Sequence, residues 1–246
     1  MGSYVVTGAG RGIGRAIAER LLDDGHRVVA VELDLDALAW TEDRPAATAV
    51  AGDARDEAVN ERAADAAGTL SGWVNNAALF RDASVHTSTT REILDLISVN
   101  LDCALAGCAT AVRRFLAAGT PGAIVNVSSH QARQAVPGCL PYATAKAAIE
   151  GMTRALAVEY GPHGIRVNAV APGSVATERY AAYLAGHDAA AVEGQMARLH
   201  PLGRVATTGE VAAAVAYLLS DDAGFVTGVT LPVDGGRTVL AHDPEG

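Results

Sequence analysis

Thr7-Gly8-Ala9-Gly10-Arg11-Gly12-Ile13-Gly14 lies between a short apolar run, Tyr4 to Val6, and the start of a helical pattern. Glycines are required in such a turn because a Cβ atom would block the close approach of a ligand or clash within the turn. The unpaired N–H groups and the dipole at the start of the helix favour an anionic group such as a pyrophosphate. This stretch therefore predicts a strand, a turn and a helix that together bind a dinucleotide.

The same rhythm continues along the chain, where Val-rich runs alternate with longer Ala- and Leu-rich segments. We expect strands at 4–7, 27–31, 72–75, 123–127, 166–170 and 230–233, and helices at 15–24, 90–118, 142–160 and 210–219. The predicted fold class is α/β, a single Rossmann-type doubly wound parallel sheet with helices on both faces. No linker-like tract divides residues 1–246, which we expect to form one domain.

One segment, from Ser174 to Arg204, departs from this rhythm. It is polar and rich in alanine, and it is inserted between an expected strand and the last expected helix. Long excursions of this kind often carry function, so we expect a lid over a ligand site at 174–204.

Composition and charge narrow the classes of partner. The chain has 19 Lys and Arg residues against 28 Asp and Glu residues, a net charge of −9, which argues against nucleic acid and anionic membranes as partners. We expect neither an apolar run of the roughly 18 residues that span a bilayer nor a signal peptide. The three cysteines have no CxxC spacing, which supports neither a disulfide framework nor a zinc site. We expect a soluble, cytoplasmic protein that binds a small-molecule substrate and no metal.

Glu32 indicates which dinucleotide is bound. It ends the second expected strand, where a carboxylate accepts hydrogen bonds from the adenine-side ribose and repels a 2′-phosphate. We therefore expect NAD to be preferred. Arg11 within the glycine turn can pair with a phosphate, which leaves NADP open, and an exposed strand end is the alternative interpretation of Glu32.

Tyr142 and Lys146 stand four residues apart at the start of an expected helix, so both side chains share one face. Tyrosine ionises near pH 10, and proton transfer near neutrality needs its pKa lowered by about 3 units, to which an ammonium can contribute. Ser128 and Ser129 end a strand at the carboxyl edge of the sheet, where open α/β sheets bind ligands. The Tyr-Lys pair alone would be read as an ordinary surface pair, but Ser129 supports a catalytic group.

With these motifs in order, nearly the whole chain resembles the short-chain dehydrogenase/reductase family, in its common form of about 250 residues. The residues that carry the resemblance are Gly8, Gly12, Gly14, Asn75-Asn76-Ala77-Ala78, Asn100, Ser129, Tyr142, Lys146, Pro172-Gly173, Thr177 and Val233-Asp234-Gly235-Gly236. Two positions depart from the family pattern: Ala78 replaces a glycine, and Val175 stands where isoleucine is frequent. Both changes are small and remove no reactive group.

The resemblance implies roles for these residues. Tyr142 is implied as the acid/base, Ser129 as a hydrogen-bond partner of the substrate oxygen, Lys146 as a ligand of the nicotinamide ribose, and Asn100 as the holder of a relay water. The cofactor-binding set implied by the turn and the resemblance is Gly8, Arg11, Gly12, Ile13, Gly14, Glu32, Asp53, Ala54, Asn76, Tyr142, Lys146, Pro172, Gly173, Val175 and Thr177. The implied reaction is hydride transfer between the nicotinamide and a carbonyl/alcohol pair.

Substrate recognition is predicted for His130 and Gln131, in the loop between Ser129 and Tyr142, and for Arg179 and Tyr183 in the expected lid. Each of these can equally be a loop, packing or helix-surface residue.

Three hypotheses for the activity remain open. The leading one is an NAD-dependent dehydrogenase of a secondary alcohol, polyol, sugar or similar metabolite. An NADPH-dependent 3-oxoacyl-thioester reductase acting with an acyl carrier protein is the alternative enzyme, and a non-catalytic dinucleotide-sensing module is the alternative of another class. The family resemblance favours a homotetramer, or a homodimer, that pairs the helices at 90–118 and 142–160 with their mates.

Overall fold

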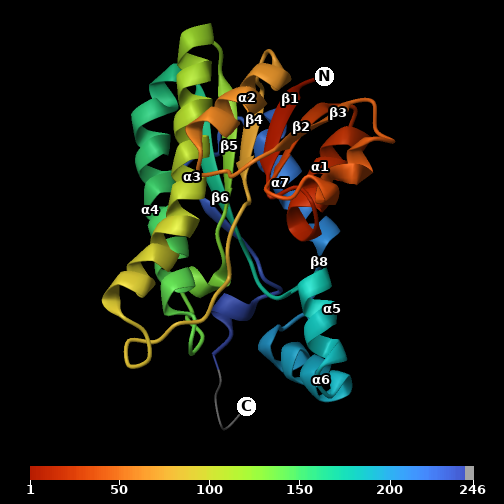
Figure 1. Ribbon diagram of the computed structural model, residues 1–246, viewed down its shortest axis with the longest axis vertical. Helices are drawn as coiled ribbons and strands as arrows, with labels where there is room; N and C mark the ends of the chain where they lie inside the picture. The colour runs from red at the N-terminus through yellow and green to blue at the C-terminus, as the bar shows by residue number, and fades with distance from the viewer. Residues whose placement is uncertain (242–246) are drawn as a thin grey trace.

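Val-rich runs pair into one parallel sheet at the centre of the molecule (Figure 1). The structure is a computed structural model, and it describes residues 1–241. The seven strands lie in the order β3-β2-β1-β4-β5-β6-β9, so the predicted doubly wound α/β fold is confirmed. Their bounds are β1 Ser3–Thr7, β2 Arg27–Glu32, β3 Ala47–Ala51, β4 Gly72–Asn75, β5 Gly122–Val127, β6 Ile165–Pro172 and β9 Thr230–Val233.

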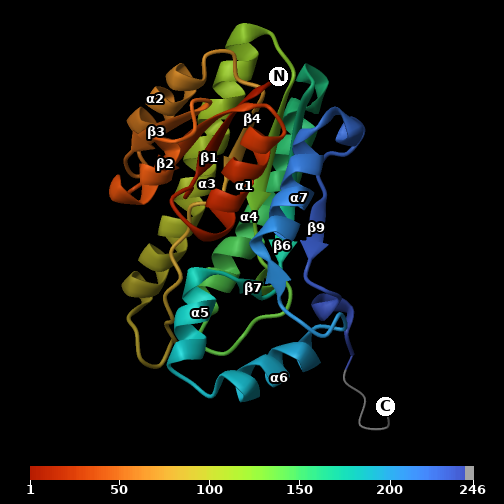
Figure 2. The ribbon, with the colours of Figure 1, turned by 90° about the vertical axis from the view of Figure 1, so that its right-hand side faces the viewer.

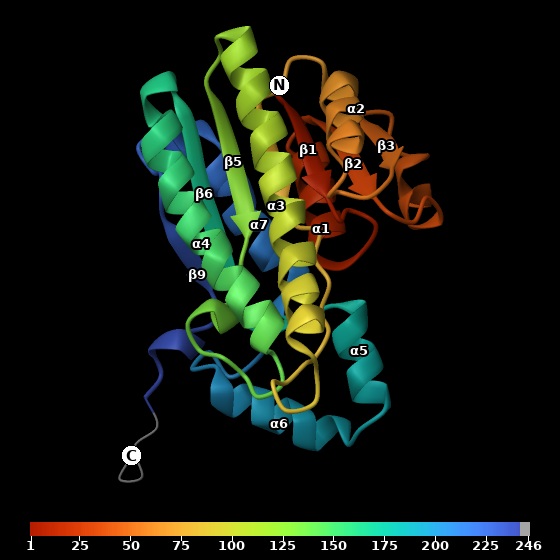
Figure 3. The same ribbon diagram turned by 60° about the vertical axis from the view of Figure 1, so that its left-hand side comes forward.

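Helices cover both faces of this sheet (Figures 2 and 3). One layer contains α1 (Gly12–Asp23) and α7 (Thr208–Leu219), and the other contains α2 (Glu57–Ala67), α3 (Thr90–Ala118) and α4 (Leu140–Tyr160). Because side chains alternate along a strand, Val6 packs in the core under α1 and α7, whereas Val5 packs in the core under α2 and α3. The sheet therefore has two apolar cores, one on each face.

The strand order reverses beside β1, which pairs with β2 on one side and with β4 on the other. The connections from β1 and β4 leave toward opposite faces, which opens a crevice at their carboxyl ends. Gly8 follows β1 and Asn76 follows β4, so the glycine turn and the Asn-Asn-Ala-Ala segment meet at this switch point.

The segment between β2 and β4 contains more structure than the sequence pattern predicts. A 3₁₀ turn at Asp36–Thr41 and the edge strand β3 precede α2. The strand β3 reads Ala-Thr-Ala-Val-Ala and is only partly buried, so it lacks the Val-rich signal of the inner strands.

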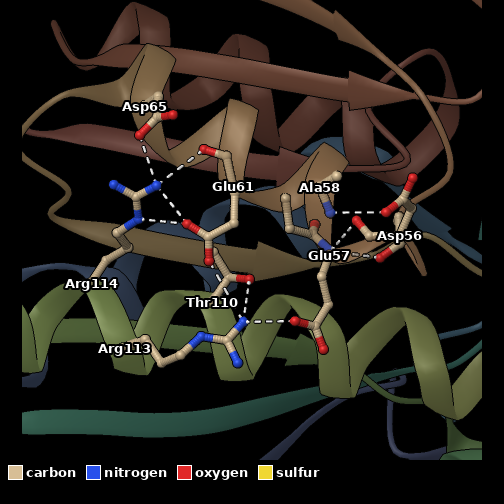
Figure 4. A network of polar contacts seen from close by, with 10 residues as sticks. Asp56, Glu57, Ala58, Glu61, Asp65, Thr110, Arg113 and Arg114 are labelled. Carbon is tan, nitrogen blue, oxygen red and sulfur yellow. Dashed lines mark hydrogen bonds and ion pairs between the residues drawn. The ribbon is translucent and has the colours of Figure 1, made fainter.

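A network of ion pairs fastens α2 to α3 (Figure 4). Arg113 pairs with Glu57 at 3.3 Å, and Arg114 pairs with both Glu61 and, at 2.7 Å, Asp65. Exposed pairs contribute at most about 1 kcal/mol each, so the network acts mainly by orienting α2. The segment that enters α2, residues 52–56, is oriented with it.

The helix α3 contains an 18-residue window with a mean hydropathy of 1.5, long and apolar enough to cross a membrane by composition alone. This differs from the expectation that no such run exists, because polar residues such as Asn100 and Asp102 interrupt the run without lowering its mean by much. In the fold, 44% of that window is buried. Core helices of globular proteins pass the same test.

The predicted lid contains two helices, α5 (Glu178–Ala185) and α6 (Ala189–Leu199), below the carboxyl edge of the sheet (Figure 2). Its ends are joined by the short parallel strands β7 (Val175–Ala176) and β8 (Ala206–Thr207). His200, which is 1% exposed, binds Met196 O through Nδ1 at 2.7 Å and accepts a hydrogen bond from Ser174 N at Nε2. The lid is therefore fixed at its base, while α5 buries none of its own residues.

Candidate active site

Ser129, Tyr142 and Lys146 meet at the carboxyl end of β5. Ser129 follows the strand, and α4 begins at Leu140 with a proline in its first turn, which is a favoured place for proline. One turn separates Tyr142 from Lys146, whose Nζ atom lies 5.3 Å from the centre of the Tyr142 ring. The same Nζ atom donates a hydrogen bond of 2.7 Å to Val127 O, which holds the ammonium beside the strand end.

The electrostatics of this group differ from the expectation of a lowered tyrosine pKa. Burial raises the pKa of Tyr142 to about 12, although the Ser129 hydroxyl and the Arg179 charge act in the opposite direction. Burial also lowers the pKa of Lys146 to about 8. Desolvation dominates both shifts, since Lys146 is buried and Tyr142 is half-buried in the wall of a cavity. In the protein alone, Tyr142 is thus a phenol at neutral pH, ready to donate a proton, and it needs further positive charge to act as a base.

Asn100 is 2% exposed and its side chain is occupied by backbone groups. Its Oδ1 atom accepts a hydrogen bond from Leu79 N, and its Nδ2 atom donates to Leu79 O and Leu96 O. These bonds hold the loop after β4 against α3. The role of Asn100 in holding a relay water stays a prediction.

The glycine turn has the shape that a pyrophosphate requires. Gly8 and Gly12 have φ angles of +66° and +57°, and a Cβ atom on Gly14 would lie 2.0 Å from Gly8 O. Asn76 supports the turn from β4, because its Nδ2 atom donates hydrogen bonds to Thr7 O and Gly8 O. Asn76 is predicted to bind the cofactor. The structure shows that it also supports the glycine turn, a role that the sequence did not indicate.

A cavity of about 530 Å³ lies beside the turn, at the ends of β2 and β3. The predicted residues Gly8, Arg11, Glu32, Asp53, Ala54 and Asn76 all line it. Glu32 accepts hydrogen bonds from Gly10 N and Leu33 N, so its carboxylate is fixed at the strand end. Arg55, which no sequence motif marks, pairs with Asp53 at 2.6 Å and lowers the pKa of that carboxyl. These dimensions and donors fit the adenosine half of a dinucleotide.

A second cavity of about 570 Å³ brings together the predicted catalytic residues Ser129, Tyr142 and Lys146. Among the residues that line it are Ile13, Asn76, Ser129, Tyr142, Lys146, Pro172, Gly173, Val175, Thr177, Arg179 and Tyr183. The two cavities share Asn76, so one extended ligand can run from the adenosine side to Tyr142. A volume of this size is typical of small-molecule sites.

His130 and Gln131 lie outside the lining of this cavity, unlike Arg179 and Tyr183. The His130 ring is 5% exposed, with Nδ1 3.2 Å from Pro172 O, and burial lowers its pKa to about 4. Within residues 1–241, His130 Nε2 and Gln131 Oε1 are buried without a hydrogen-bond partner. Gln131 N donates to Ser129 Oγ, so this short turn orients the serine from behind.

Several neighbours of the site carry no sequence signal. Phe80, in the irregular loop after β4, packs against the Tyr142 ring at 4.9 Å between ring centres. Glu150 is 6% exposed. It forms an ion pair with Arg133, in the loop between Ser129 and Tyr142, and accepts a hydrogen bond from Ser128. No motif or periodicity marks these residues, because each contact joins segments that are distant in the chain.

Within residues 1–241, no group of three or more His, Cys, Asp or Glu side chains is placed to hold a metal ion.

Known proteins resemble this chain over most of its length. The sequence model of a family described as Enoyl-(Acyl carrier protein) reductase matches residues 8–238. The 3beta-hydroxysteroid dehydrogenase 1 of Eggerthella lenta is 39% identical over 96% of this chain and 94% of its own. The L-xylulose reductase of Bos taurus is 39% identical over 94% of each chain. The structure of 3-ketoacyl-(acyl-carrier-protein) reductase from Brucella melitensis, complexed with NADH, has a TM-score of 0.85 at 30% identity, covering 96% of this chain and 97% of that one.

Proposed function

Because the chain belongs to the short-chain dehydrogenase/reductase family, we propose that it interconverts a secondary alcohol and its ketone, with NAD as the preferred cofactor and Tyr142 as the proton-transferring group. The observation that carries this proposal is the placement of Ser129, Tyr142 and Lys146 in one cavity that continues into the glycine turn. It is an oxidoreductase of hydroxyl and keto groups, as its relatives are by name. This counts against the non-catalytic sensing module.

The residues of the chain divide the work of the reaction. The bound nicotinamide supplies or accepts the hydride. In reduction, Tyr142 donates its phenolic proton to the carbonyl oxygen while Ser129 donates a hydrogen bond to the same oxygen. In oxidation the proton moves in the opposite direction. The positive charge that Tyr142 then needs is provided in part by Lys146, which also holds the nicotinamide ribose.

The preference for NAD rests on the adenosine-side cavity. Glu32 presents a fixed carboxylate where the ribose hydroxyls would lie, and it repels a 2′-phosphate. Two arginines are nearby, but Asp53 already neutralises Arg55, which leaves Arg11 as the cation that would favour NADP.

We place the substrate among polyols, sugars and similar hydroxylated metabolites, since L-xylulose reductase is a relative at 39% identity. The alternative is an NADPH-dependent reductase of a 3-oxoacyl thioester. The description of the matching family and the Brucella melitensis structure favour it by name, whereas Glu32 argues against it.

We also propose a cytoplasmic homotetramer. The faces of α3 and α4 that are turned away from the sheet carry exposed apolar side chains, which a partner subunit would cover: Leu94, Leu105, Leu116 and Val158.

The test is the variant Tyr142→Phe, which removes the transferable proton and keeps the ring that packs on Phe80. We expect the rate of NADH-linked ketone reduction to fall about 10²–10⁴-fold, the usual contribution of an acid/base group, while NADH affinity is retained. Tyr217→Phe, on α7 and outside the cavity lining, is the matched control and should keep its rate within a few-fold. Full turnover by Tyr142→Phe would show that another group transfers the proton.

A further inference from the structure

The cavity around Tyr142 has a charge opposite to that of the whole chain. Its lining contains Lys146, Arg179 and Arg237 but no aspartate or glutamate, although the chain carries a net charge of −9. Lys146 is committed to Val127 O, and the proposed mechanism assigns it to the cofactor. Neither arginine transfers the proton or the hydride, and although the Arg179 charge lowers the pKa of Tyr142, this does not account for a second arginine in the same cavity.

Arg179 enters the cavity from the lid. Its guanidinium carbon lies 3.8 Å above the Phe80 ring, and Phe80 in turn packs against Tyr142. Stacking fixes the plane of the guanidinium and leaves its N–H edge free to form hydrogen bonds. Arg179 lines the same cavity as Tyr142, and its charge lowers the pKa of both Tyr142 and Cys139. Within residues 1–241, no carboxylate lies within 4.0 Å of it.

Arg237 lines the same cavity from the turn at Arg237–Val239, which follows β9. In Figure 3 the chain after β9 lies on the opposite side of the molecule from the lid helix α5. It is half-buried and donates a hydrogen bond of 3.0 Å to Ser174 Oγ. The nearby carboxylate of Asp234 is occupied by Thr238 and by Gly236 N, and in the described part of the chain it forms no ion pair with Arg237. The Asp234 charge acts on Arg237 only from beyond ion-pair distance, so this partly desolvated cation can still accept a ligand of opposite charge.

From these contacts we infer that the substrate of this enzyme is a hydroxy or oxo carboxylic acid, whose carboxylate is bound by Arg179 and attracted by Arg237. The inference rests on the proposed reaction at Tyr142 and narrows the hydroxylated metabolites of the proposed function to those that carry a carboxylate. A guanidinium binds a carboxylate through two parallel N–H···O bonds, which orients the bound molecule as well as attracting it. Arg179 stacks on the same Phe80 ring that packs against Tyr142. In a bound substrate, the carboxylate held by Arg179 and the carbon that reacts beside Tyr142 would therefore be a few bonds apart.

Two other anions fit the positions of the arginines less well. The cofactor pyrophosphate belongs at the glycine turn, where the lid residue next to Arg179, Glu178, faces Gly12 N at 3.4 Å. Arg179 itself stacks over Phe80, away from that turn. An acidic carrier protein would contact the outer rim of the opening, whereas Arg237 is half-buried within the cavity.

The experiment compares short hydroxy acids with their methyl esters, which differ in charge but share the reacting alcohol. NADH formation is followed for the wild type, Arg179→Met, Arg179→Lys and Arg237→Met. Arg198→Met is the control, since Arg198 lies on the lid helix α6 and outside the cavity lining. NADH affinity is measured by calorimetry for every variant, and binding of a non-reacting carboxylate, succinate, to the NADH complex gives a readout that needs no turnover.

For the wild type we expect kcat/KM to favour the acid over its ester by at least tenfold. Arg179→Met should lower the acid-to-ester ratio by about 30-fold or more, the range for hydrogen bonds to a charged group, with NADH affinity unchanged. Arg237→Met should lower it about 3- to 10-fold, and Arg179→Lys should recover part of the loss. Succinate binding should weaken in the same order, and Arg198→Met should match the wild type.

Three results would overturn the inference. One is a wild type that oxidises neutral alcohols or esters without preferring acids, a result that leaves the proposed hydride transfer intact. Another is loss of NADH affinity in Arg179→Met with an unchanged acid-to-ester ratio, which would assign the arginine to the cofactor. The last is selective turnover of acyl thioesters over free acids. If neither acids, esters nor neutral alcohols are turned over and Tyr142→Phe behaves like the wild type, the proposed function itself fails.

Discussion

Replacing Glu32 by glutamine removes the charge at the end of β2 and keeps the shape of the side chain. Glu32 is fixed by hydrogen bonds from Gly10 N at 3.1 Å and Leu33 N at 2.8 Å. Glutamine retains one carbonyl oxygen for Gly10 N, and water can serve the exposed Leu33 N. The variant therefore isolates the electrostatic part of cofactor selection.

The magnitude follows from two opposing effects. A 2′-phosphate carries a charge of about −2, and at roughly 5 Å in a water-like dielectric its repulsion by one carboxylate is about 1.7 kcal/mol. Removing that repulsion should tighten NADPH binding by about 18-fold. The ribose hydroxyls of NADH lose a charged acceptor for a neutral one, at a cost of about 1 kcal/mol, or roughly fivefold in affinity. The ratio of the two dissociation constants should thus shift by about 100-fold toward NADPH.

The assay is titration of wild type and variant with NADH and with NADPH, followed by energy transfer from tryptophan to the nicotinamide. Trp40 is well placed to report, because its indole N–H donates a hydrogen bond to Ala9 O in the glycine turn. Asp34→Asn is the control: it removes an equal charge two residues away, outside the cavity lining. A wild type that binds NADPH more tightly, or a ratio that moves by less than about 3-fold in Glu32→Gln, would refute the assignment of Glu32 to the ribose.

Two predictions concern stability and its dependence on pH. Lys146 has a pKa of about 8 in the folded state, against a reference value of 10.5. At pH 7 the lysine is therefore charged in both the folded and the unfolded state, and the cost of burying the ammonium destabilises the folded state. Lys146→Met should raise the free energy of unfolding by about 1–3 kcal/mol at pH 7 and by less at pH 10, while activity is lost. Urea unfolding at the two pH values measures this, and a less stable variant at pH 7 would contradict it. His130 has a folded pKa of about 4 against 6.5, so the unfolded chain takes up its proton first and stability falls by about 3 kcal/mol as the pH drops from 6.5 to 4. His130→Gln should flatten that part of the curve, exposed His163→Gln should leave it unchanged, and equal slopes in both variants would show that His130 is not the group responsible.

The features that the sequence predicts well are local ones. The glycine turn, the strand before it and the helix after it are contiguous, and the four-residue spacing of Tyr142 and Lys146 places them on one face of any helix. The inner strands are Val-rich because both of their faces are buried, so their positions are predicted within two residues. The edge strand β3 lacks this pattern because it is only partly buried, and it was not located.

The sequence by itself therefore determined the α/β fold, the dinucleotide turn and the placement of Tyr142 and Lys146 on one helix face, since each follows from neighbours in the chain. Tertiary structure decided what surrounds that tyrosine. Phe80, Arg179 and Arg237 come from a loop, the lid and the C-terminal turn, and only folding brings them to one cavity. The pKa of Tyr142 likewise rises rather than falls, because desolvation depends on how much of the chain packs around the phenol and not on the lysine four residues away.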